Sequence, residues 1–196
     1  MRLIAIGAST GGPLVLQTIL ARLPRTLPVP VLIVQHIAAG FLQGMADWLR
    51  TTTGFPTQIA AAGQTPLPGH AYLAPDGFHM VVTGTGRIGL DAAGDEILRP
   101  SVARLFASVA EVFGSRAAGV LLTGMGKDGA DELGRMRSRG ALTIAQSRQS
   151  SIVFGMPGEA VRIGAAAHVL NPEDIAALLL RSIGVVTTSN KTAHRL

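Results

Sequence analysis

The chain has 196 residues, of which 24 are glycine and none is cysteine, so it suits one domain and excludes disulfides, thiolate nucleophiles and cysteine-bound metals. Hydrophobic residues make up 47% and charged residues only 15%, which excludes a disordered chain or a coiled coil. The net charge is +5, but the arginines are scattered and aromatic residues are few, so the sequence does not indicate nucleic-acid binding.

Short apolar runs alternate with amphipathic stretches along the chain, a pattern typical of buried parallel strands joined by helices. The expected strands are Leu3–Ile6, Val31–Val34, Gly119–Leu122, Leu142–Ala145 and Ala167–Leu170. The expected helices are Pro13–Leu23, Phe41–Arg50, Val102–Phe113 with a start signal at Arg99-Pro100-Ser101, Asp131–Arg139, and one that begins at Asn171-Pro172.

The middle of the chain differs from the rest. Between Thr57 and Asp91, glycine and proline separate short runs that predict strands, among them Tyr72–Ala74 and His79–Val82. Asp76-Gly77 stands between these two runs and predicts the turn of a hairpin.

The expected fold is therefore an α/β, doubly wound, mostly parallel sheet flanked by helices, Rossmann-like, with an antiparallel hairpin at one edge. We expect residues 1–184 to form one domain, because no repeat or linker interrupts them. Residues 185–196 are polar and without pattern, and we expect a disordered tail there.

A glycine-rich turn, Gly7–Pro13, follows the first expected strand and opens a helix. A glycine-rich turn of this kind also makes a nucleotide-binding module the alternative interpretation. Two features argue against that alternative: a dinucleotide fingerprint needs glycine where Ser9 stands, and a phosphate loop needs a lysine that this turn lacks. The turn instead offers a hydroxyl at a helix N-terminus, where free N–H groups can bind an oxyanion. Ser9 is a candidate nucleophile on this ground, and a helix-capping serine is the simpler reading.

Two more polar side chains follow expected strands. His36 comes directly after the second strand, and Asp128 stands among the glycines of Thr123–Gly129. Ligands of open α/β sheets bind at the carboxyl ends of the strands, so Ser9, His36 and Asp128 are expected at one edge. A hydroxyl, a base and a carboxylate are what nucleophilic acyl transfer needs. A structural histidine and an aspartate that caps the following helix are the simpler interpretations.

The chain resembles the catalytic domain of the bacterial chemotaxis protein-glutamate methylesterase family, CheB. The similar segments are Ile6–Pro13, Val34–His36, Gly40–Phe41, Tyr72–Pro75, Arg99–Val102, Leu121–Ala130 and Val153–Pro157. They run in family order over about residues 2–182, and the serine segment together with Gly-Met-Gly-x-Asp-Gly makes the resemblance specific.

The resemblance implies a role for each matched position. Ser9 matches the nucleophile, His36 the general base and acid, and Asp128 the carboxylate that orients the histidine. Thr10 and Met125 match positions of the oxyanion site, acting through backbone N–H groups. The family hydrolyses γ-glutamyl methyl esters on chemoreceptors and also deamidates certain glutamines, with no cofactor and no metal. A catalytically inactive signalling scaffold of the same descent is a further alternative.

The resemblance also implies partners and a location. We expect a cytoplasmic protein that acts on methylated chemoreceptor helices, with a receiver domain in cis or in trans, no nucleic acid and no membrane insertion. Full-length family members carry an N-terminal receiver domain, and we expect this chain to be either an excised catalytic domain or a stand-alone relative. Two prolines that usually follow the histidine loop are replaced by Ala38 and Ala39, and acidic residues after Gln146 are replaced by Ser147 and Arg148. We expect these changes to affect the loop over the site and the choice of partner.

Three other features are given no catalytic role. The resemblance places Gly155–Pro157 beside the rim of the site. His79 is interpreted as a structural or substrate-side residue, and Lys127 as an exposed one.

Overall fold

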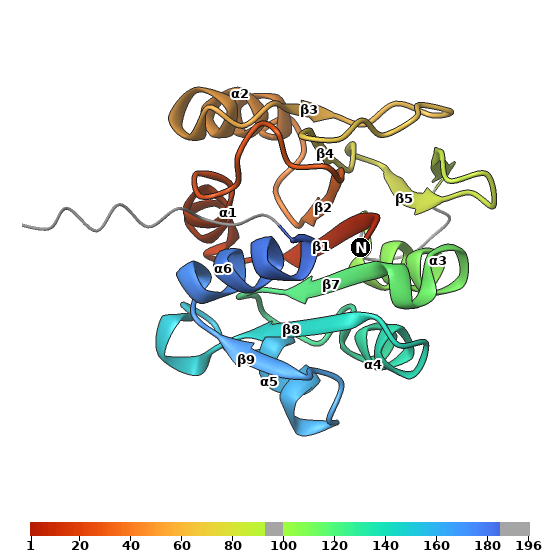
Figure 1. The fold of residues 1–196 in the computed structure, drawn as a ribbon. Helices are drawn as coiled ribbons and strands as arrows, with labels where there is room; N and C mark the ends of the chain where they lie inside the picture. The colour runs from red at the N-terminus through yellow and green to blue at the C-terminus, as the bar shows by residue number, and fades with distance from the viewer. Residues whose placement is uncertain (93–99, 185–196) are drawn as a thin grey trace, which may run out of the picture.

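The computed structural model describes residues 1–92 and 100–184, and its centre is a seven-stranded sheet in which every pair is parallel (Figure 1). In spatial order the strands are β3 (Thr57–Ile59), β4 (Ala71–Leu73), β2 (Val31–Gln35), β1 (Leu3–Ala8), β7 (Ala117–Leu121), β8 (Leu142–Gln146) and β9 (His168–Leu170). The chain runs outward from β1 in one direction and then returns to continue from β7 in the other. The doubly wound parallel sheet is confirmed, and its strand order reverses between β1 and β7.

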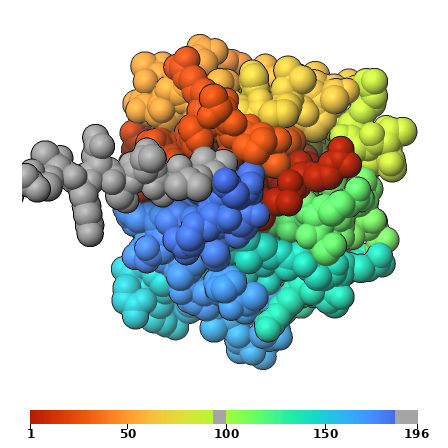
Figure 2. Space-filling model, viewed as in Figure 1, coloured from red at the N-terminus to blue at the C-terminus, as the bar shows by residue number. Residues whose placement is uncertain are grey.

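Helices cover both faces of this sheet because the central strands are apolar on both sides. One face packs against α1 (Gly12–Leu20), α2 (Leu42–Thr53) and α6 (Pro172–Ile183), and the other against α3 (Val102–Val112), α4 (Ala130–Ser138) and α5 (Met156–Arg162). Successive residues of β1 alternate between the two cores: Ile4 and Ile6 join the first, and Leu3 and Ala5 the second. In the space-filling view the first residues, in dark red, lie between segments from the middle of the chain and α6 (Figure 2).

The antiparallel hairpin is present as a sheet of its own. Strands β5 (Phe78–Val82) and β6 (Ile88–Ala92) pair with each other and pack on α3 through Met80, Val82 and Ile88. The expected turn at Asp76-Gly77 is wrong. β4 lies between β3 and β2 and has no free edge to pair with β5, so Gly77, at φ 78°, turns the chain out of the main sheet instead.

The five expected strands and five expected helices are all present, with bounds shifted by a few residues. Asn171 caps α6 as expected, since its side chain accepts a hydrogen bond from the Asp174 N–H at 2.9 Å. Helix α5, over seven residues, was not predicted as a helix. Arg99 of the expected start signal and the expected disordered tail, residues 185–196, lie outside the described residues.

Candidate active site

Three neighbouring strands deliver the predicted polar side chains to one edge of the sheet. Ser9 follows β1, His36 follows β2, and Asp128 lies in the loop after β7. The register pairs Ala8 with Gln35, so the next residues, Ser9 and His36, leave the sheet at the same level. Backbone hydrogen bonds extend this pairing past the strands, from the His36 N–H to Ala8 O at 3.0 Å. The site lies where the strand order reverses, which is where open α/β sheets bind ligands.

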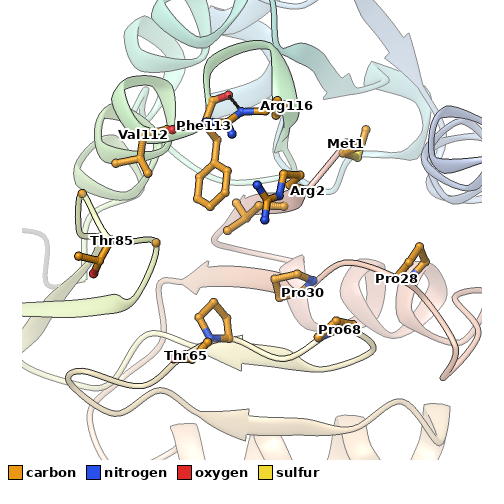
Figure 3. Close-up of a pocket in the computed structure, with 14 residues that line it drawn as sticks. Met1, Arg2, Pro28, Pro30, Thr65, Pro68, Thr85, Val112, Phe113 and Arg116 are labelled. Atoms are coloured by element: carbon orange, nitrogen blue, oxygen red, sulfur yellow. Dashed lines mark hydrogen bonds between the residues drawn. The ribbon is translucent and has the colours of Figure 1, made fainter.

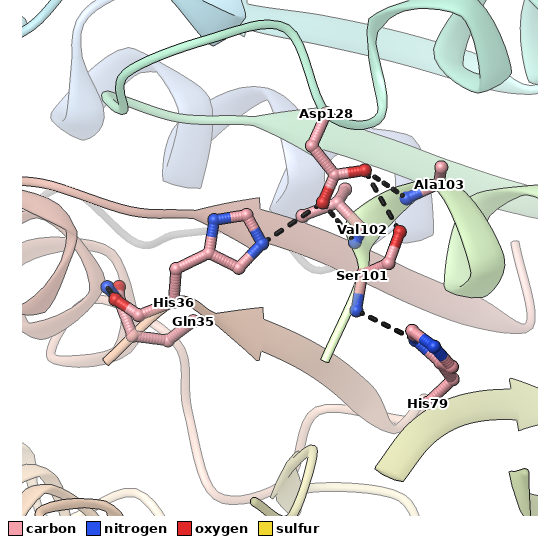
Figure 4. A network of polar contacts seen from close by, with 7 residues as sticks. All are labelled: Gln35, His36, His79, Ser101, Val102, Ala103 and Asp128. Carbon is pink, nitrogen blue, oxygen red and sulfur yellow. Dashed lines mark hydrogen bonds and ion pairs between the residues drawn. The ribbon is translucent and has the colours of Figure 1, made fainter. Parts of the chain in front are cut away.

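His36 and Asp128 are in direct contact (Figure 4). Nε2 of His36 lies 3.0 Å from Oδ2 of Asp128, and only 14% of the histidine and 8% of the aspartate side chain are exposed. A carboxylate can only accept, so Nε2 carries the proton and donates. In the neutral ring this leaves Nδ1 as the nitrogen with a free lone pair, the atom that can take up a proton.

The carboxylate of Asp128 is held at the N-terminus of α3. The Val102 N–H donates to Oδ2 at 2.7 Å, and the Ala103 N–H and the Ser101 hydroxyl both donate to Oδ1 at 3.0 Å. Burial alone would raise the pKa of Asp128, but the hydrogen bonds from His36, Ala103 and Val102 outweigh it and hold the pKa below its usual value. Asp128 is therefore a carboxylate at neutral pH.

The simpler interpretation of Asp128, as the cap of the helix that follows it, is wrong. That helix is α4, its N-cap residue is Gly129, and no side chain caps it. Asp128 instead supplies the acceptor that α3 lacks, because the Ser101 side chain at the N-cap of α3 makes no capping bond of its own. A loop more than twenty residues away along the chain thus caps α3.

Ser9 does not cap a helix either, since the N-cap residue of α1 is Gly11. The turn around it is held by the backbone and by Gln35: the Gly12 N–H and Nε2 of Gln35 both donate to Ser9 O at 2.8 Å. Among the described residues, no hydrogen bond involves the Ser9 hydroxyl. The serine side chain is half-buried beside the histidine loop and free of a structural partner.

The loop after β7 packs directly against Ser9. A Cβ atom on Gly124 would lie 2.7 Å from Cβ of Ser9 and 2.3 Å from Sδ of Met156, so only glycine fits there. This close approach brings Met125, the next residue, to the serine turn. Within the described chain, the backbone N–H groups of Thr10, the residue after Ser9, and of Met125, the residue after Gly124, donate no hydrogen bond.

Sequence reasoning missed the buried polar residues that join these loops. The amide of Gln146 accepts from the Thr123 N–H at 2.8 Å and donates to Ser150 O at 2.8 Å, and the Thr123 hydroxyl donates to Thr10 O at 2.9 Å. Gln35 links the first two loops in the same way. A signal was available, because Gln35 and Gln146 are polar residues at the carboxyl ends of largely apolar strands.

The remaining sequence candidates lie around this centre. His79 is buried on β5, where its Nδ1 accepts from the Ser101 N–H at 3.2 Å, so it supports the segment that holds Asp128. Ala38 and Ala39 are exposed, and their loop is anchored by the Gly40 N–H, which donates to Asp76 at 2.9 Å. Across the described parts of the chain, no group of three potential ligands is placed to hold a metal ion.

Comparison with known proteins identifies the family of the chain. The family described as CheB methylesterase matches residues 4–179. The chain is 55% identical to a protein-glutamate methylesterase/protein-glutamine glutaminase of Geobacter metallireducens over 91% of this chain and 52% of the relative. It is 45% identical to the protein-glutamate methylesterase FrzG of Myxococcus xanthus over 93% of this chain and 55% of the relative.

A solved structure gives the same result in three dimensions. The CheB methylesterase catalytic domain of Thermotoga maritima superposes with a TM-score of 0.88 at 34% identity, over 94% of this chain and 98% of that one. The chain spans about half the length of the curated relatives it matches. It belongs to the CheB methylesterase family.

Proposed function

We propose that this chain is a cofactor-independent serine hydrolase that removes methyl groups from glutamate γ-methyl esters on cytoplasmic chemoreceptor helices, and that it can deamidate glutamines at equivalent positions. The observation that carries the proposal is the hydrogen bond between His36 and the ionised Asp128, at the edge of the sheet where Ser9 stands. The names of the relatives, which include methylesterase and glutaminase, support the substrate class.

The proposed reaction has two steps. Nδ1 of His36 takes the proton of the Ser9 hydroxyl as its oxygen attacks the ester carbonyl, and Asp128 stabilises the imidazolium that forms. The oxyanion is bound by the N–H groups of Thr10 and Met125, His36 returns the proton to the departing methoxide, and methanol leaves. Water, deprotonated by His36, then attacks the acyl-enzyme, releasing the glutamate carboxylate and restoring Ser9.

The surface around the site is suited to a polypeptide substrate. Met125, Ile152 and Phe41 are 79%, 68% and 66% exposed, and Ile152 packs against the serine turn at Gly11. Exposed apolar side chains around a reactive group favour contact with an apolar part of a larger partner.

We propose residues 1–184 as the catalytic domain, working in the cytoplasm and regulated by a receiver domain in cis or in trans. Among the described residues, no helix has the length and hydropathy that crossing a bilayer requires.

The test is release of methanol from a receptor cytoplasmic fragment methylated on its glutamates. We expect release that depends on the protein and stops when inhibitors of serine hydrolases modify Ser9. A chain that releases no methanol but still binds the fragment would be an inactive scaffold, and saturable binding of dinucleotides would favour the nucleotide-binding alternative.

A further inference from the structure

A cavity lies beside the proposed site. Its volume is about 600 Å³, and it is formed by the loop after β7, the loop after β8 and helix α5. Lys127, which precedes Asp128 in the chain, and Gly126, which follows Met125, both line it. Gly155 and Gly158 line it too.

The side chains around this cavity carry excess positive charge. Arg162 is paired with Glu159 through two hydrogen bonds of 2.8 and 2.7 Å, and this pairing holds the pKa of the Glu159 carboxyl below its usual value. Lys127 and Arg148 line the same cavity, and within the described chain neither forms an ion pair or a side-chain hydrogen bond. Arg148 therefore faces this space with no carboxylate bound to it, and Lys127 interacts with Glu159 through its charge only, helping to lower the pKa of that carboxyl.

Arg148 is held in position before any ligand arrives. Its guanidinium lies 4.6 Å from the ring centre of Phe154, a cation–π contact that leaves the N–H groups at the edge of the guanidinium free to donate. Arg148 begins the short 3-10 turn η2 (Arg148–Ser150), which is tied to Gln146 through Ser150. Gln146 also bonds Thr123 of the loop that carries Asp128, so the cation is connected to the site through buried hydrogen bonds.

We propose that this cavity is a subsite for a carboxylate of the substrate, namely an acidic side chain close to the esterified glutamate in the same polypeptide. The inference rests on the proposed function and adds a specificity determinant to it. A planar guanidinium binds a carboxylate through two parallel hydrogen bonds, and Lys127 supplies a second positive charge. Recognition through this cavity would select esters that lie in acidic surroundings.

The test uses two helical peptides that each carry one glutamate γ-methyl ester and differ only in the flanking residues, glutamate in one and glutamine in the other. We expect wild-type kcat/KM, measured by methanol release, to be roughly tenfold higher for the glutamate peptide. Arg148→Gln should lower kcat/KM for the glutamate peptide to about the value for the glutamine peptide and so abolish this preference. Arg2→Gln removes an equal charge at the opposite end of the sheet and should leave the preference intact.

Equal hydrolysis of the two peptides by the wild type would overturn the proposal, and so would equal losses in Arg148→Gln and Arg2→Gln, which would show long-range charge attraction only. A binding measurement keeps the test independent of turnover: fluorescence anisotropy of the ester-free peptides should show weaker binding of the glutamate peptide to Arg148→Gln alone. Normal binding selectivity with no hydrolysis of either peptide would contradict the proposed function and support the subsite.

Discussion

At each end of the parallel sheet, one end of helix α3 binds a charged side chain: an anion at the carboxyl ends of the strands and a cation at the amino ends. At the carboxyl ends of the strands, the N-terminus of α3 binds the carboxylate of Asp128. At the amino ends, the last carbonyls of α3 accept hydrogen bonds from Arg116, at 3.0 Å to Val112 O and 3.3 Å to Phe113 O. Each end of the helix dipole thus meets the charge that stabilises it. Both ends of α3 therefore bind a side chain with the charge that stabilises the helix, but the candidate catalytic residues lie at its N-terminus.

The difference lies in what accompanies each charge. The amino end forms a cavity of about 440 Å³ lined by Arg2, Arg116 and Phe113 and by four prolines, which have no backbone N–H to donate (Figure 3). The carboxyl end has glycine-rich loops with free N–H groups, and its charge is bonded to a histidine. A charge at a helix end stabilises the fold at both places, and a proton acceptor beside a hydroxyl makes one of them a candidate for chemistry.

Removing the hydroxyl gives the largest effect we expect. Ser9→Ala should lower methanol release by roughly 10⁶-fold, because no other group can form the acyl-enzyme. Thr65→Ala removes an exposed hydroxyl from the cavity at the other end of the sheet and should leave the rate unchanged. Steady-state kinetics of both variants make the comparison, and a Ser9→Ala protein with a tenth of wild-type activity would contradict the assignment.

The second-largest effect is expected from a substitution that removes the charge of Asp128 but keeps its shape. Asp128→Asn should lower kcat by roughly 10⁴-fold, because the amide can donate to His36 and favour the wrong tautomer of the ring. The folded structure should survive, since the amide oxygen can still accept from the start of α3. Circular dichroism would establish folding, and normal kcat in a folded variant would show that Asp128 acts only as the cap of α3.

The sequence was sufficient for the class of fold, a doubly wound parallel sheet, and for the three candidate residues. Alternation of apolar runs with amphipathic stretches is a local signal, and parallel strands bring their carboxyl ends together, so Ser9, His36 and Asp128 could be placed at one edge. The sequence did not predict which groups donate hydrogen bonds to the carboxylate of Asp128. The pairing of a loop carboxylate with the N-terminus of α3 joins residues 25 or more positions apart in the chain, and no local pattern encodes it.

The wrong hairpin turn has a related cause. Asp76-Gly77 is a favourable turn by local preference, but whether a turn closes a hairpin depends on a free strand edge next to it. β4 pairs with β2 on one side and β3 on the other, so it has no free edge with which β5 could pair. Helix α5 was missed because its seven residues are too few for a periodic pattern.

Adding a methyl group at the contact between two loops should have an intermediate effect. Gly124→Ala places a Cβ against Ser9 and Met156, and we expect a destabilisation of about 1–3 kcal/mol and a rate loss of roughly 10²-fold as the serine shifts. Gly84→Ala at the amino end is the matched control, because a Cβ there meets nothing within 4 Å. Urea unfolding and kinetics of both variants test this, and equal behaviour would argue against tight packing at the site.

A smaller effect is expected from the hydroxyl that supports Asp128. Ser101→Ala removes one of four hydrogen bonds to the carboxylate and should cost about 1.5 kcal/mol in the free energy of unfolding. Because Ser101 positions Asp128 and does not touch substrate, kcat should fall roughly tenfold with KM unchanged. Ser101→Thr retains the hydroxyl and should recover most of the rate, whereas loss of kcat in both variants would indicate a packing effect.

The smallest effect we expect is on stability in acid. The pKa of Asp128 is lowered in the folded protein, so this carboxylate adds stability above its unfolded pKa of about 3.9, and that contribution is lost as the pH falls through the folded value. One proton changes the free energy of unfolding by at most about 1.4 kcal/mol per pH unit. Urea unfolding from pH 6 to pH 3 should therefore show a shallower decline for Asp128→Asn than for the wild type. Asp91→Asn, an exposed carboxylate on β6, should follow the wild type. If both variants declined as the wild type does, the bonds at the start of α3 would not be what keeps Asp128 ionised, and the two ends of that helix would differ less than the geometry indicates.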